Sequence, residues 1–93
     1  MKTASGSVRL ANATAVADKI LDRLAEVCGT EEVRTNPDLG LFDRQILDSM
    51  KTVELILAIE EEFGLYVSPA ELDREMWATP GKIIRDIQRR MEP

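Results

Sequence analysis

The sequence contains no histidine, and its single cysteine is Cys28. Histidine is the most common general base near neutral pH and the most common metal ligand, so its absence argues against a hydrolase and against a metal centre. One cysteine cannot form an internal disulfide, which agrees with a reducing compartment. Because no basic residue lies at i±3 or i±4 to lower its pKa, we expect Cys28 to be buried and unreactive. We therefore predict no catalytic residue and no metal ligand.

The sequence also lacks a long apolar run. It has no candidate transmembrane helix, and residues 1–7 lack the apolar core of a secretory signal peptide. The 93 residues suit one domain, and a chain of this length buries only about 60–65% of its unfolded surface. We expect one compact, monomeric domain in the cytoplasm, without a deep active-site cleft and without direct insertion into a membrane.

The negative charge is concentrated in the middle of the sequence. Residues 41–66 carry two basic and six acidic side chains, within a formal net charge of −5 for the whole chain. Such a surface repels nucleic acid, whose binding depends on basic side chains that neutralise phosphates, and it attracts a basic protein partner. A solvated helix face is enough to explain the three glutamates at 60–62, whereas Asp48 and Glu54 are better candidates for contact with a partner.

Apolar residues recur at helical spacing in three long segments, at about residues 12–28, 49–63 and 80–91. No segment has a strand pattern that competes with this reading. We predict an all-α fold of the four-helix-bundle type, with these three longer helices and one short helix at about residues 69–75.

The short helix is predicted from a capping box. Ser68 at the N-cap, Pro69 at the first helical position and Glu71 three residues after the cap all favour a helix start. Trp77 comes after this helix. It can contact a partner, but it is better explained as a cover for the core between the short helix and the last one.

Two segments lack strong helical periodicity. Residues 1–11 are expected to form a flexible leader, which leaves residues 12–93 as the folded domain. Residues 30–47 form a long connection, and a loop of this length in a small domain is either pinned by its own apolar groups or functional. We expect five apolar side chains to pin it to the core: Leu39, Leu41, Phe42, Ile46 and Leu47.

Ser49 begins the helix at 49–63 and directly follows Asp48, which can cap the first turn. The simplest role for Ser49 is that of a helix-start residue. A catalytic nucleophile would need a base, and Lys51, the only candidate nearby, points away from Ser49 on the helix. An acceptor for a phosphate-linked group needs only an exposed hydroxyl near the unpaired N–H groups and positive dipole of a helix N-terminus. Spacing alone does not decide between the first and the third role.

The segment Ile46-Leu47-Asp48-Ser49-Met50 resembles the phosphopantetheine attachment motif of acyl carrier proteins. Residues 52–55 and 58–63 resemble the second helix of that family. The segment Leu72-Asp73-Arg74-Glu75-Met76-Trp77-Ala78-Thr79-Pro80 is similar to the D-alanyl carrier subfamily, the subunit 2 type of D-alanine–poly(phosphoribitol) ligase. The similarity extends from about Val16 to Met91, which is nearly the whole predicted domain.

The resemblance implies a carrier without catalytic activity of its own. Ser49 would be esterified by 4′-phosphopantetheine from coenzyme A, through a separate phosphopantetheinyl transferase. The terminal thiol of the arm would hold an aminoacyl or acyl group as a thioester. An ATP-dependent ligase would load it, with D-alanine as the expected cargo, and a downstream membrane acyltransferase would receive it. By position, the resemblance assigns partner docking to Asp48, Met50, Val53 and Glu54, although Met50 is equally explained as a core residue.

Two residues depart from the pattern of the family. Gln45 stands where the family usually has glycine, and Lys51 stands where a glycine or an acidic residue is common. The leader is also longer than usual. These departures bear on the cargo more than on the carrier role. Two alternatives stay open: an acyl or peptidyl carrier for another biosynthetic pathway, and an unmodified acidic protein-interaction module.

Overall fold

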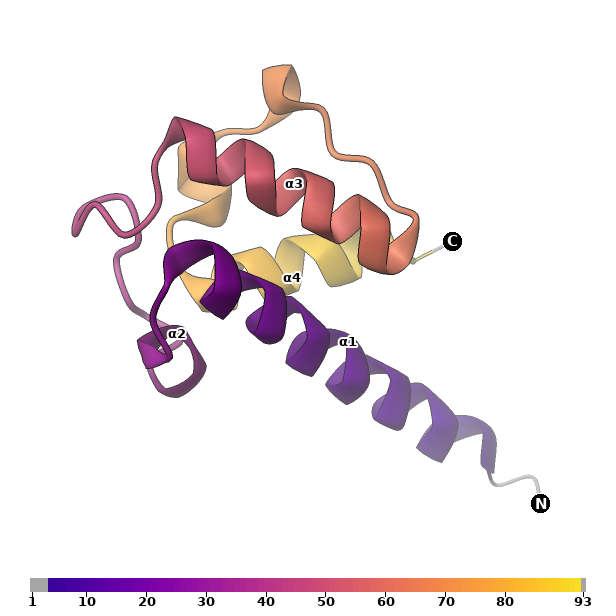
Figure 1. Ribbon diagram of the computed structural model, residues 1–93. Helices are drawn as coiled ribbons and strands as arrows, with labels where there is room; N and C mark the ends of the chain where they lie inside the picture. The colour runs from indigo at the N-terminus through magenta and orange to yellow at the C-terminus, as the bar shows by residue number, and fades with distance from the viewer. Residues whose placement is uncertain (1–3, 93) are drawn as a thin grey trace.

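The computed structural model describes the backbone of residues 4–92 and the side chains of residues 14–92. Within this part of the chain the secondary structure is entirely helical (Figure 1). The elements in chain order are α1 (Ala4–Cys28), α2 (Glu32–Thr35), α3 (Ser49–Phe63), the 3-10 helices η1 (Pro69–Glu71) and η2 (Arg74–Trp77), and α4 (Pro80–Arg90). The predicted all-α class with three longer helices is confirmed.

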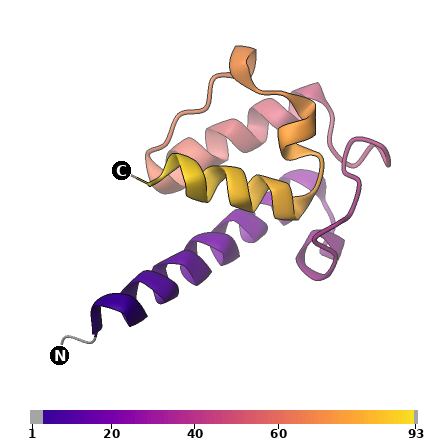
Figure 2. The same cartoon turned by 180° about the vertical axis from the view of Figure 1, so that it is seen from behind.

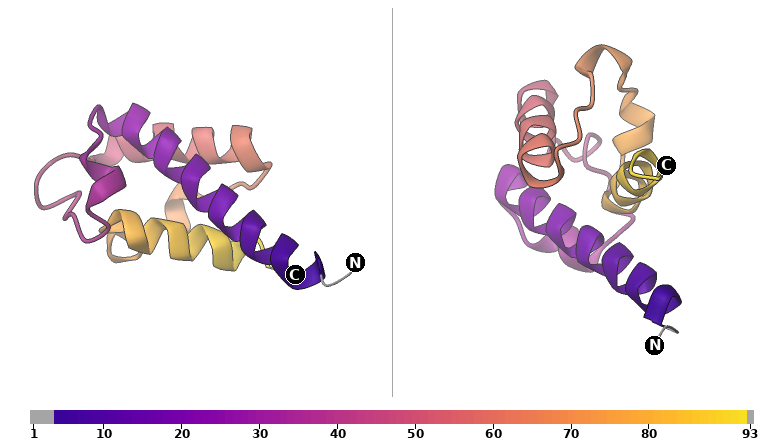
Figure 3. Two further views of the ribbon diagram at one scale, coloured as in Figure 1. Left: turned by 90° about the horizontal axis from the view of Figure 1, so that it is seen from below. Right: turned by 90° about the vertical axis from the view of Figure 1, so that its right-hand side faces the viewer.

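The three long helices surround one core. Helix α1 packs against both α3 and α4, and η2 packs against α4. The N-terminal turns of α1 extend beyond these contacts, as Figure 2 shows from behind. The chain between α3 and α4 runs back along α3 toward its N-terminal end, so η1 and η2 lie beside the N-terminal part of that helix (Figures 1 and 3).

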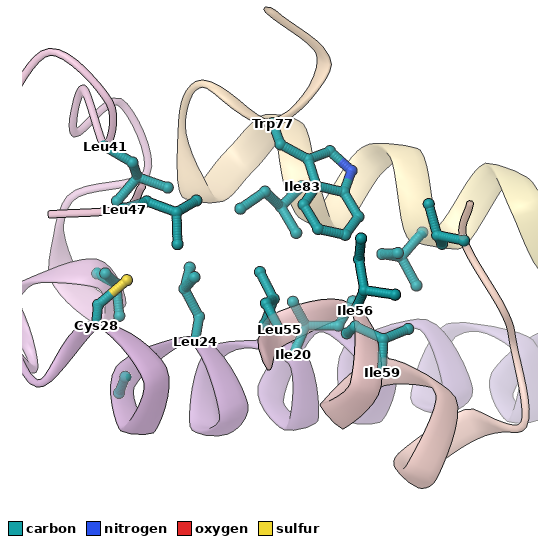
Figure 4. Packing of buried hydrophobic residues seen from close by; sticks show 14 of the residues in the cluster. Ile20, Leu24, Cys28, Leu41, Leu47, Leu55, Ile56, Ile59, Trp77 and Ile83 are labelled. Carbon is teal, nitrogen blue, oxygen red and sulfur yellow. The ribbon is translucent and has the colours of Figure 1, made fainter. Parts of the chain in front are cut away.

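The core takes side chains from each long helix and from the connections (Figure 4). Its fully buried members on the helices are Ile20, Leu24, Val33, Leu55, Ile56, Ile59, Trp77, Ile83 and Ile87. Cys28 is buried at the edge of this cluster, as predicted. Burial raises the pKa of its thiol, which keeps the thiol protonated and poorly nucleophilic.

Trp77 is completely buried, so its predicted role as a cover for the core is confirmed. The structure adds a partner for it. The indole N–H of Trp77 donates to Oδ2 of Asp86 at 3.0 Å, and Arg90 Nε donates to the same oxygen at 2.8 Å. Arg89 donates to the other carboxylate oxygen. Asp86 is the one buried charged side chain among the described residues, and these hydrogen bonds satisfy it.

The connection between α1 and α3 is pinned by its own apolar groups, as predicted. Leu39, Leu41 and Leu47 are buried, and Phe42 and Ile46 pack against the core from half-buried positions. The backbone reinforces this arrangement, because Leu41 N donates to the carbonyl of Ala78 at 2.9 Å. The short helix α2 in this connection was not predicted, since four residues are too few to show a helical period.

Gln45 has a positive φ of 59°, and it is the one residue other than glycine with this conformation in the described chain. The left-handed region costs an L-residue with a Cβ roughly 1–2 kcal/mol, and glycine avoids that cost but loses more entropy on folding. We expect Gln45→Gly to raise the free energy of unfolding by roughly 0.5–1 kcal/mol, measured as a higher urea midpoint. Gln45→Ala retains the Cβ and should give no gain. Equal urea midpoints for the glycine and alanine variants would show that the positive φ of Gln45 does not strain the backbone.

Helix α1 begins at Ala4, so the prediction that this helix starts near residue 12 was wrong. Residues 4–11 contain no proline, and extending a helix that is already nucleated costs far less than starting one. The helical backbone thus runs through most of the segment predicted as a flexible leader; residues 1–3 of that segment lie outside the described chain. No helix within residues 4–92 combines the length and apolar character needed to cross a membrane.

The short helix predicted at residues 69–75 was also wrong, because two separate 3-10 turns occupy this region. The hydroxyl of Ser68 makes no capping hydrogen bond. Asp73 Oδ1 instead accepts from Glu75 N at 3.0 Å and starts η2, after Leu72 has adopted an extended conformation. The side chain of Asp73 competes for the backbone N–H groups that a continuous helix would use. Among residues 4–92 the one short α-helix is therefore α2.

Candidate functional site

Ser49 is the first residue of α3, and its side chain is exposed. The preceding Asp48 has extended backbone, and its Oδ1 accepts from Lys51 N at 2.8 Å, which confirms the predicted cap. The carbonyl of Asp48 accepts from Thr52 N at 2.8 Å and from Thr52 Oγ1 at 2.6 Å. These bonds fix the first turn of α3 and hold the Ser49 hydroxyl at the molecular surface.

The hydroxyl of Ser49 forms no hydrogen bond with another residue of the described chain. In particular, Lys51 does not contact it as a base would. A nucleophilic serine needs an adjacent base that removes its proton, and no side chain among residues 14–92 is placed to do so. The hydroxyl of Ser49 is therefore exposed to solvent and free of hydrogen bonds to the described residues.

A shallow depression lies beside Ser49, between the start of α3 and the segment with η1 and η2. Its volume is about 230 Å³, below the roughly 300–1,000 Å³ of typical small-molecule pockets. Its lining combines apolar walls, two hydroxyls and one guanidinium: Phe42, Ser49, Thr52, Val53, Pro69, Leu72 and Arg74. The guanidinium carbon of Arg74 lies 5.0 Å from the centre of the Phe42 ring, a cation–π contact.

Sequence reasoning missed this depression. Phe42 was expected only to pin the connection. Arg74 lies in the segment that resembles D-alanyl carriers, but no role was predicted for it. The lining residues come from the connection, from α3 and from the later segment at 69–74, and no spacing or periodicity could have grouped the last of these with the first two.

The apolar residues of α3 form two stripes, only one of which enters the core. Leu55, Ile56 and Ile59 are buried, whereas Met50, Val53 and Leu57 are 73%, 44% and 57% exposed. Met50 is therefore not a core residue, which was one of the two explanations left open for it by the sequence. The three exposed side chains recur at i, i+3 and i+7, which places them on one side of the helix, and α1 and α4 do not cover that side.

The four residues predicted to dock partners all lie exposed at the N-terminal end of α3. Asp48 and Glu54 are exposed acids, and they flank the apolar side chains of Met50 and Val53. Leu57 extends the same stripe by one turn and was not among the predicted docking residues. We call Met50, Val53 and Leu57, with Asp48 and Glu54, the α3 surface. Exposed apolar side chains rimmed by charge are typical of a protein-interaction site.

The acidic residues at the other end of α3 have a structural role. Glu62 accepts hydrogen bonds from Lys19 Nζ and Arg23 Nε, each at 3.2 Å, and Glu61 pairs with Arg23 at 3.1 Å. The hydrogen bonds from Lys19 and Arg23 lower the pKa of Glu62. These pairs join α3 to α1, so a solvated face is not the whole explanation of the glutamates at 60–62. Asp48 and Glu54, by contrast, form no ion pair within the described residues.

Comparison with known proteins shows that the region around Ser49 belongs to a known family. Residues 18–87 match the family described as the phosphopantetheine attachment site. The chain is 43% identical over 74 residues to the D-alanyl carrier protein of Lacticaseibacillus casei strain BL23. This alignment covers 80% of this chain and 91% of that protein. It is 46% identical over 69 residues to the D-alanyl carrier protein of Bacillus subtilis strain 168. That alignment covers 74% of this chain and 88% of the relative. The D-alanyl carrier protein of Enterococcus faecalis strain V583 is 38% identical over 73 residues.

Proposed function

This chain belongs to the phosphopantetheine-dependent carrier proteins of the D-alanyl carrier type, and on that premise we propose that Ser49 is the residue modified. The observation that carries the proposal is the exposed hydroxyl at the first position of α3, inside the matched region. Ser49 Oγ forms an ester bond to the phosphorus as the diphosphate bond of coenzyme A breaks. Adenosine 3′,5′-bisphosphate leaves, and the hydroxyl proton passes to a base of the transferase.

The residues around Ser49 fit a phosphodiester. The N–H groups of Ser49 and Met50 have no partner within α3, because they belong to its first turn. The positive end of the helix dipole favours a negative group there by roughly 0.3–1 kcal/mol. When bound, the prosthetic group supplies a thiol that holds an aminoacyl group as a thioester. The chain itself fixes the attachment point and presents it to other enzymes.

We propose D-alanine as the cargo, because the D-alanyl carrier proteins of several bacteria align with most of this chain. The carrier then works with three kinds of enzyme: a phosphopantetheinyl transferase, an ATP-dependent ligase that activates and loads the amino acid, and an acyltransferase that removes it. We propose the cytoplasm as the location of the first two reactions, because coenzyme A and ATP are available there. We assign residues 12–93 to the carrier domain.

We propose that the α3 surface is where these enzymes dock. Met50 has the most exposed side chain of its three apolar members, and methionine adapts its shape to more than one partner. Asp48 and Glu54 add negative charge beside it, which steers basic surfaces toward Ser49. One surface next to the attachment point allows each enzyme to reach the arm in turn.

Loading of the modified chain by a D-alanine-activating ligase tests the proposed cargo and the proposed docking surface. With ATP and labelled D-alanine, the modified chain should gain label that free thiols release. Met50→Ala should lower kcat/KM for loading roughly fivefold to tenfold, because a central apolar side chain of a docking surface commonly contributes more than 1 kcal/mol.

The matched control is Met91→Ala, which removes another partly exposed methionine, 42% exposed, beyond the end of α4. Its loading should equal that of the parent chain. Equal loading of the Met50→Ala variant would contradict the docking surface. Loading with other acids but not with D-alanine would instead favour a carrier for another pathway.

A further inference from the structure

Arg74 is the cationic member of the depression beside Ser49. It lies at the start of η2, and its guanidinium is held over the ring of Phe42 at 5.0 Å. Both side chains line the depression together with Ser49. The contact with Phe42 restricts a long side chain that would otherwise sample many rotamers, so a positive charge is kept near the Ser49 hydroxyl.

This charge lacks a counter-ion in the described part of the chain. Five other arginines there form ion pairs: Arg23, Arg34, Arg44, Arg89 and Arg90. The acids on either side of Arg74 are engaged elsewhere. Asp73 accepts from Glu75 N, and Glu75 pairs with Lys82 at 2.8 Å. Arg74 therefore has donors available for an anion that the protein itself does not supply.

We propose that Arg74 binds the phosphate of the prosthetic group on Ser49, an inference that depends on the proposed attachment. A guanidinium matches the geometry of phosphate oxygens and donates two hydrogen bonds to them. The carbon skeleton next to that phosphate carries two methyl groups, which suit the walls formed by Phe42, Val53 and Leu72. Arg74 is thus a positioning residue that holds the base of the arm.

The chemistry excludes the other end of the arm as the partner of Arg74. An aminoacyl thioester has lost its carboxylate and retains its ammonium group, which a guanidinium repels. The depression is also smaller than a typical ligand pocket, so it accommodates part of the arm and leaves the rest outside. Fixing the phosphate end while the thioester end stays accessible is what successive docking with several enzymes requires.

A thermodynamic cycle tests the inference. Unmodified and modified forms of the parent chain, Arg74→Gln and Arg85→Gln are prepared, and the Tm of each is measured. Modification should raise the Tm of the parent by roughly 2–5 °C more than it raises the Tm of Arg74→Gln, given the usual strength of an exposed ion pair. Loss of the contact with Phe42 affects both forms of the variant and cancels in the cycle. The difference between the Tm gains of the parent and of Arg74→Gln should shrink at high salt, which screens the ion pair.

Arg85→Gln is the matched control, since it removes another arginine without an ion pair in the described chain, on the exposed side of α4. The Tm of Arg85→Gln should rise on modification by as much as the Tm of the parent chain. The ³¹P resonance of the modified chain should shift in Arg74→Gln and not in Arg85→Gln. Equal Tm gains and unchanged ³¹P resonances in all three chains would overturn the role of Arg74 alone. Failure of the parent chain to gain the group would overturn the proposed attachment, and this inference with it.

Discussion

Replacing Ser49 by alanine is expected to abolish modification by coenzyme A and a phosphopantetheinyl transferase, and with it all thioester loading. The substitution removes the one hydroxyl at the start of α3 that is exposed and makes no hydrogen bond in the described chain. The helix itself should remain, because Asp48 supplies the cap and alanine is a good helix former. Intact mass after incubation, together with a helical circular dichroism spectrum, separates loss of the site from loss of the fold.

Ser68→Ala is the matched control for that experiment. Ser68 also precedes a helical turn, but it lies before η1 and its side chain makes no capping hydrogen bond. This variant should be modified to the same extent as the parent chain. Full modification of the Ser49→Ala variant would show that another hydroxyl carries the group.

Asp86→Ala should lower the free energy of unfolding by roughly 2–3 kcal/mol. The carboxylate is buried and accepts from Trp77 Nε1, so its removal leaves an indole N–H in the core without a partner. Arg89 and Arg90 retain access to water, which keeps the loss below the 3–5 kcal/mol of a fully buried broken pair. The expected fall in Tm is roughly 8–20 °C.

Thermal unfolding of Asp18→Ala provides the control, since this substitution removes an exposed carboxylate from α1 and should change stability by less than about 0.5 kcal/mol. Equal Tm values for the two variants would show that the hydrogen bond to Trp77 adds nothing.

The same carboxylate predicts a pH dependence. Burial acts to raise the pKa of Asp86, but hydrogen bonds from Arg90, Arg89 and Trp77 outweigh burial and lower it. Since the pKa is lower in the folded chain than in the unfolded one, the contribution is present above about pH 4 and is lost as the pH falls through the folded value. Asp86→Asn cannot titrate, so its unfolding free energy should fall less steeply with acid than that of the parent. Identical acid profiles would contradict this assignment.

The parts of the fold that local chemistry determines were predictable. The bounds of α3 follow from Asp48, whose carboxylate caps the first turn, and from Gly64, whose φ of 69° ends the helix. The start of α4 follows from Thr79, whose hydroxyl accepts from Lys82 N at 3.2 Å. The position of Ser49 at a helix N-terminus was therefore accessible from the sequence.

Features that depend on packing between distant segments were not predictable. Periodicity could not tell the buried stripe of α3 from the exposed one, because both are apolar and recur at helical spacing. The choice depends on which side α1 and α4 cover. The grouping of Phe42 and Arg74 beside Ser49, and the burial of Asp86 against Trp77, likewise arise only when the chain returns past α3.

Peptide mapping of the modified parent chain tests the central claim most directly. Trypsin cleaves after Arg44 and after Lys51, and the peptide of residues 45–51 contains Ser49 as its only hydroxyl side chain. We predict that the mass of one phosphopantetheine group appears on this peptide and on no other. A modified chain in which residues 45–51 keep their unmodified mass would contradict it.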